Sequence, residues 1–127
     1  MPAVRIAALL GIAAMTAGAS APPLLGQWGA PGANLTIGAD GARLDQECGS
    51  GSFGPVQADA RGHFKTSGRF EMYQPGPQRA DETPGGNAAF EGTVAGDTLH
   101  LTIRPASGAA QQMTLLRGKR AKLIRCY

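Results

Sequence analysis

The residues of this chain that could do chemistry are few and scattered. The two histidines, His63 and His100, each lack a second nitrogen or thiolate ligand at metal-site spacing. Asp81 and Glu82 are adjacent, and adjacent carboxyl groups need not face each other as an acid–base pair. No serine lies in a G-x-S-x-G motif. We therefore predict no catalytic residue, no metal and no cofactor, and an enzyme would need residues that only the fold brings together.

A glycine-rich stretch resembles a phosphate-binding loop. Gly49, Gly51 and Gly54 form the pattern G-x-G-x-x-G, which binds a dinucleotide when it joins a strand to a helix. Here Pro55 and the β-favouring Val56 follow, and no helix is indicated. We interpret the glycines as a bulged connection between strands.

The first 19 residues have the pattern of a secretory signal peptide. Arg5 precedes an apolar run over 6–15, and small residues over 16–21 offer an A-x-A cleavage site after Ala19. The run is shorter than the ~20 residues of a membrane-spanning helix, so an uncleaved anchor is the lesser alternative. We expect a single domain, residues 20–127, in the periplasm or secreted, with no transmembrane segment after signal removal.

The charge balance argues against nucleic acid as a partner. The whole chain has a net charge of +3, and loss of Arg5 with the signal peptide leaves +2. Basic residues gather over 117–125, which we interpret as a solvated turn and outward strand positions.

Cys48 and Cys126 are the only cysteines. In an exported chain two cysteines predict one disulfide, which would close most of the mature chain into a loop and contribute roughly 4 to 5 kcal/mol in the chain-entropy model. The alternative is a reactive thiol pair, for which a C-x-x-C spacing would be expected.

Apolar and polar residues alternate strictly along several stretches of the chain, as they do in β-strands with one buried face. The stretch 88–105 predicts a hairpin that turns at Ala95-Gly96-Asp97, and 63–73 is the longest alternating run, with Gly68 marking a bend or a close backbone approach. Residues 111–116 fit a strand or a short helix and are taken as a strand, followed by a last strand over 122–127. We predict an all-β fold, a small antiparallel up-and-down β-barrel of eight or nine strands.

The predicted interior gives the ligand-binding candidates. An eight-stranded barrel holds packed side chains or one small apolar ligand. The candidates are Phe64, Phe70, Met72, Phe90, Leu99 and Leu101, with Val94 and Ile103 beside them, and their alternative role is plain core. The long loop over 74–87 is a second place to look for function, and its candidates are Pro77, Arg79, Asp81 and Glu82.

Gly26-x-Trp28 resembles the start of lipocalin-like (calycin) barrels. In those barrels the tryptophan closes one end and a basic side chain from the last strand lies over its ring, an arrangement that apolar burial and cation–π attraction favour. The resemblance implies structural roles for Trp28 and for Arg125 or Arg117.

A wider set of motifs is similar to an uncharacterised family of small exported bacterial proteins. The motifs are G-x-W-G, E-C-G, G-x-F-x-x-x-G-x-F-x-x-Y, G-P-x-R, F-x-G-x-V-x-G-D-T-L-x-L-T, L-x-R-G and the C-terminal R-C-Y. The resemblance implies a signal peptide, an all-β fold and paired cysteines, and carries no catalytic residue. We expect a non-enzymatic binding module of the cell envelope for a small apolar ligand. The alternatives are a protein–protein module, such as an inhibitor of an envelope enzyme, or an enzyme with a site at the barrel mouth.

Overall fold

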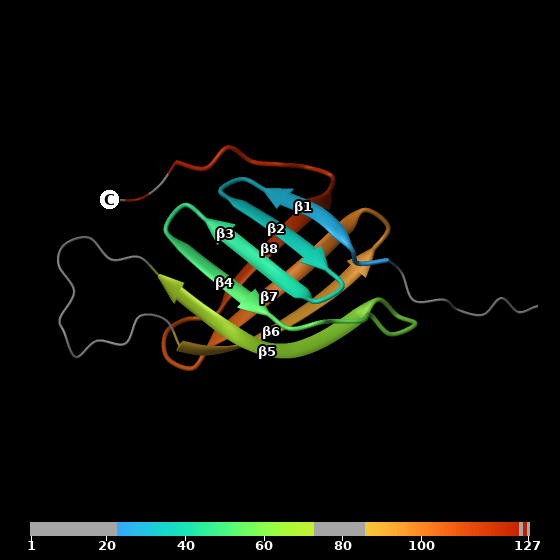
Figure 1. Cartoon of the computed structure of the whole chain (residues 1–127), viewed down its shortest axis with the longest axis horizontal. Helices are drawn as coiled ribbons and strands as arrows, with labels where there is room; N and C mark the ends of the chain where they lie inside the picture. Colours follow the sequence, from blue (N-terminus) through green and yellow to red (C-terminus); the bar gives the residue numbers. More distant parts are fainter. Residues whose placement is uncertain (1–22, 73–85, 125, 127) are drawn as a thin grey trace, which may run out of the picture.

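Eight antiparallel strands form a closed barrel in the computed structural model, which describes residues 23–72, 86–124 and 126. The strands are β1 (Gly26–Ala30), β2 (Ala33–Gly38), β3 (Gly41–Gln46), β4 (Gly49–Phe53), β5 (His63–Met72), β6 (Gly86–Ala95), β7 (Thr98–Pro105) and β8 (Gln111–Arg117). Each strand pairs with the next, and β8 pairs with β1 (Figure 1). The predicted all-β up-and-down barrel is confirmed, with eight strands. The described residues contain no helix that could cross a membrane.

The core follows the predicted alternation. On β7, Leu99, Leu101 and Ile103 are buried between outward-facing neighbours, because successive side chains of a strand point to opposite faces. Gly68 on β5 lies where a Cβ would overlap the backbone oxygen of Ser52. The predicted close backbone approach is therefore confirmed, and it lets the sheet curl tightly enough to close.

Residues 49–53 differ from the sequence-based interpretation. They form a full strand, β4, which pairs with both β3 and β5, and not a bulged connection. Alternation is present, with Gly49, Gly51 and Phe53 inward, but glycines hide it from a hydrophobicity pattern. Gly51 is suited to its place because a Cβ there would lie 3.1 Å from the Phe70 ring. β6 likewise begins earlier than expected, at Gly86.

The predicted strand over 122–127 is wrong for the residues that the structure describes there. β8 already pairs with β7 on one side and β1 on the other, so the closed barrel offers no edge to a further strand. Residues 118–124 and Cys126 instead form a C-terminal strap that lies outside the barrel, along β1 and β2 (Figure 1). Residues 111–117 are a strand, as predicted.

Polar contacts and the disulfide hold this strap. The side-chain amide of Asn34 donates to the Ala121 carbonyl at 2.8 Å and accepts from the Ala121 N–H at 2.7 Å. Further along, the Glu47 carboxylate accepts from the Ile124 N–H at 3.1 Å. The predicted disulfide is confirmed and joins Cys48 to Cys126 across 78 residues of sequence, with a Cα–Cα distance of 5.1 Å.

Candidate functional site

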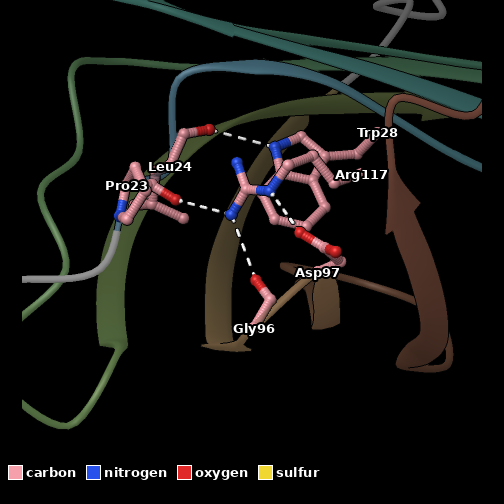
Figure 2. Close-up of polar contacts among 6 residues, drawn as sticks. All are labelled: Pro23, Leu24, Trp28, Gly96, Asp97 and Arg117. Atoms are coloured by element: carbon pink, nitrogen blue, oxygen red, sulfur yellow. Dashed lines mark hydrogen bonds and ion pairs between the residues drawn. The ribbon is translucent and has the colours of Figure 1, made fainter.

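Trp28 and Arg117 close one end of the barrel (Figure 2). The indole is fully buried, and the Arg117 guanidinium carbon lies 4.2 Å from the centre of its ring. The two residues are partners in the β1–β8 pairing, which has only two register pairs. A cation over an indole face contributes about 0.5 to 2 kcal/mol beyond the burial of area, so this stack reinforces the shortest seam of the barrel.

Hydrogen bonds tie the same pair to its surroundings. The Trp28 Nε1–H donates to the Leu24 carbonyl at 3.0 Å, which fixes the chain that leads into β1. Arg117 donates through Nε to Asp97 Oδ1 at 3.1 Å, and through Nη2 to the carbonyls of Gly96 and Pro23 at 3.1 and 3.0 Å (Figure 2). Arg117 therefore holds the N-terminal segment against the β6–β7 turn. The basic partner of Trp28 is Arg117, while Arg125 lies outside the described residues.

An apolar hollow of about 460 Å³ lies at this closed end. Its lining carries no charged side chain: Pro23, Leu24, Leu25, Ala39, Pro55, Val56, Gln57 and Ala58. Leu24 and Ala58 form its buried base, whereas Leu25 is 57% exposed. The N-terminal segment, the β2–β3 turn and the β4–β5 loop thus combine into one apolar surface that opens to solvent.

Asp59 shapes the loop that forms one wall of the hollow. Its Oδ1 accepts hydrogen bonds from the backbone N–H groups of Arg61 at 2.8 Å and His63 at 2.9 Å. The bond from His63 is the main cause that keeps the pKa of the Asp59 carboxyl below its usual value, because it stabilises the ionised form. This exposed carboxylate has a structural role at the end of the loop.

In the described part of the chain, side chains from the strands pack against one another inside the barrel. Of the predicted ligand-binding residues, Phe64, Phe70, Phe90, Leu99 and Leu101 are all buried and belong to one core cluster. The Phe53 ring lies 4.6 Å from that of Phe90 and 6.1 Å from that of Phe64, measured between centroids. A Cβ on Gly92 would overlap the Phe64 ring. These contacts are those of a packed core, so a ligand among these rings would have to displace them.

Met72, the sixth predicted ligand-binding residue, lies apart from the other five. It has the inward parity of β5 but stands at the last position of the strand, and it is 47% exposed. Its sulfur lies 3.8 Å from Gln111 Nε2, at the barrel end opposite Trp28. The difference arises because alternation gives the face of a side chain but not how far the neighbouring strands extend to cover it.

The two histidines lie on the outer surface of the described barrel, each beside a polar side chain. His63 Nε2 lies 3.7 Å from Glu91 Oε2, and Arg104 lies 3.8 Å from the other oxygen of Glu91, on the outer surface. His100 Nδ1 lies 3.1 Å from the Thr114 hydroxyl. Among residues 23–72, 86–124 and 126, no three His, Cys, Asp or Glu side chains gather as metal ligands. The loop candidates Pro77, Arg79, Asp81 and Glu82 lie outside the described residues.

No family model, curated protein or solved structure matches this chain. Its function must therefore be argued from its own residues.

The sequence analysis missed the apolar hollow. Leu25 precedes β1, and Pro55 and Val56 lie in a loop, so none of them belongs to an alternating pattern. The available signal was the pair Leu24-Leu25 directly before Gly-x-Trp, since two adjacent leucines cannot both face inward if the chain there is extended.

Proposed function

We propose that this chain is an exported, non-enzymatic binding module of the bacterial cell envelope that holds an apolar part of another protein at the hollow beside Trp28. The observation that supports this proposal is that the interior residues pack against one another, whereas the apolar hollow lies at the end of the barrel, over Leu24 and Ala58 of the core, and opens to solvent. A carried small ligand is usually buried over most of its surface. The exposed Leu25 beside an open hollow better suits a protruding side chain of a partner.

Three further observations support export and a lipocalin-like module. The intramolecular disulfide fits an oxidising compartment. The basic residue over Trp28 fits the resemblance to calycin barrels. The motifs that resemble those of small exported bacterial proteins fit the same location. The alternative, a small apolar ligand, would occupy the same hollow.

Site-specific photo-cross-linking in the native host tests this proposal. A photoreactive amino acid would replace Leu25 or Ala39, which line the hollow, and as a control Gln112, an exposed residue on β8. We expect one defined protein adduct from positions 25 and 39 and none from 112. Leu25→Asp should reduce the adduct formed at position 39 by about tenfold or more, because a buried leucine contributes ~1.5 to 3 kcal/mol.

The other outcomes of this experiment are equally informative. A lipid-sized adduct at positions 25 and 39 would show that the hollow binds a small apolar ligand and not a protein. Equal labelling from position 112, or a position 39 adduct that is insensitive to Leu25→Asp, would contradict binding at the hollow.

A further inference from the structure

A charged groove lies on the outer face of β3, β4 and β5, away from the apolar hollow. Arg43 on β3 lines one side of the groove, and Arg69 and Glu71 on β5 line the other. Asp45, the next outward-facing residue after Arg43 on β3, lies beside it. Ser50-Gly51-Ser52 on β4 forms the floor between the two sides. The three strands lie side by side in Figure 1.

The strand register sorts the charges into two rows. Ser52 is paired with Arg43 on one side and with Arg69 on the other. Ser50 is paired in the same way with Asp45 and Glu71. The rows are two residues apart along β4, roughly 6.6 to 6.8 Å, and the walls stand about 9.5 Å apart because neighbouring strands are separated by about 4.8 Å. The groove therefore has a positive half and a negative half.

The small floor residues make the groove a real depression, with a volume of about 180 Å³. The Arg43 Nε lies 3.2 Å from Asp45 Oδ1, and the Ser50 hydroxyl lies 3.5 Å from Glu71 Oε1. An exposed ion pair of this kind is weak, so an incoming charged group can compete with it.

This pattern is not the one that stabilises a sheet. Cross-strand stabilisation places opposite charges on paired positions, whereas here both arginines flank one serine and both acids flank the other. Two like charges that flank a small neutral residue on neighbouring strands are suited to an opposite charge supplied from outside.

From this arrangement we infer a second binding site, for an extended protein segment that carries an acidic and a basic side chain two residues apart. In an extended chain, side chains at i and i+2 point to the same side and are separated by the same distance as the two rows. The acidic group then lies over Ser52 between the arginines, and the basic group lies over Ser50 between the carboxylates. A single anion would use only the arginine row and would meet the acidic row beside it.

A second copy of this chain is a weaker occupant. The face is self-complementary under a two-fold rotation. However, six side chains on a curved barrel surface are far fewer than the ~20 to 30 residues that each partner of a stable interface contributes.

The test uses capped pentapeptides and the full chain with its disulfide formed. The probe is acetyl-Thr-Glu-Val-Lys-Thr-amide, and the matched control, acetyl-Thr-Glu-Lys-Val-Thr-amide, has the same composition but places the charges on opposite sides of an extended chain. Binding is followed through backbone amide shifts in two-dimensional ¹H–¹⁵N NMR spectra. We expect the probe to shift Ser50, Gly51 and Ser52 in a saturable manner that weakens in about 0.5 M salt, and the control to bind at least about threefold more weakly.

Protein variants make the inference specific. Arg69→Gln and Glu71→Gln should each raise the dissociation constant of the probe peptide by roughly three- to tenfold. Lys65→Gln, which removes a charge from the outer face of the same strand outside the groove, should leave it unchanged. Dispersed spectra show that each variant folds.

Several results would overturn this inference. They are equal binding of the two peptides, no binding of either peptide, or shifts of β4 amides by inorganic phosphate as large as those caused by the probe. If the β4 amide signals shift with protein concentration in the absence of peptide, this face instead binds a second copy of the chain. The amide shifts distinguish binding on β4 from binding at the hollow, which residues 24–25 and 56–58 report. Failure of this inference therefore leaves the proposed function at the hollow untouched.

Discussion

Replacing Cys48 and Cys126 together with serine should lower the free energy of unfolding by roughly 4 to 5 kcal/mol. The disulfide spans 78 residues, so its loss returns a large loop entropy to the unfolded chain. Small domains are stable by only about 5 to 15 kcal/mol, so this loss removes about a third or more of the total stability. The C-terminal strap loses its covalent attachment at the same time, since Cys126 belongs to it, and keeps the hydrogen bonds with Asn34 and Glu47.

Urea unfolding followed by circular dichroism measures this loss. The unchanged protein in reducing buffer is the matched control and should lose the same free energy, since reduction breaks the same bond. A double variant within 1 kcal/mol of the oxidised protein would contradict a stabilising role for the disulfide.

Trp28→Ala should lower the free energy of unfolding by about 3 to 5 kcal/mol, the usual range for truncating a large buried side chain. The indole is fully buried, its ring carries the Arg117 guanidinium, and its N–H satisfies the Leu24 carbonyl. Removing it therefore leaves a cavity at the short β1–β8 seam and separates the N-terminal segment from the barrel end.

The neighbouring leucine supplies the control for this second variant. Leu25→Ala removes an apolar side chain one residue from Leu24, but Leu25 is 57% exposed, so its unfolding midpoint should barely change. The unfolding midpoint of Trp28→Phe should fall between those of the two alanine variants, because phenylalanine keeps a smaller aromatic ring and loses the indole N–H donor. If Trp28→Ala unfolds at the same urea concentration as Leu25→Ala, Trp28 does not close the barrel.

Much of the fold could be predicted because alternation with a period of two is a direct consequence of strand geometry. It placed Leu99 and Leu101 in the core and identified the β6–β7 hairpin correctly. Where glycine replaces the apolar residue, as at Gly49 and Gly51, the pattern is invisible, and β4 was mistaken for a connection.

Closure of the barrel explains the other fold error. Residues 122–124 carry a strand-like pattern, but whether they find a pairing edge depends on the far end of the chain, because β1 occupies the edge of β8. Local periodicity contains no information about such long-range pairing.

The candidate site was less predictable than the fold. The G-x-W motif identifies Trp28, and the structure shows that its basic partner is Arg117. The hollow and the groove depend on which loops and strands become neighbours: Leu25 and Pro55 line the same hollow, and Arg43 is paired with Ser52. Surface sites of this kind arise from register and loop placement, which a single sequence does not encode as a local pattern.

Xenon binding followed by methyl NMR tests the central claim, that the interior is filled and recognition takes place outside it. Xenon enters apolar cavities and leaves packed cores unoccupied. We predict that xenon pressure shifts the methyl groups of Leu24, Leu25 and Val56 in a saturable manner and leaves those of Leu99, Leu101 and Ile103 unchanged. Saturable shifts of the interior methyl groups, with none at the hollow, would contradict the account. They would indicate that a small apolar ligand binds inside the barrel.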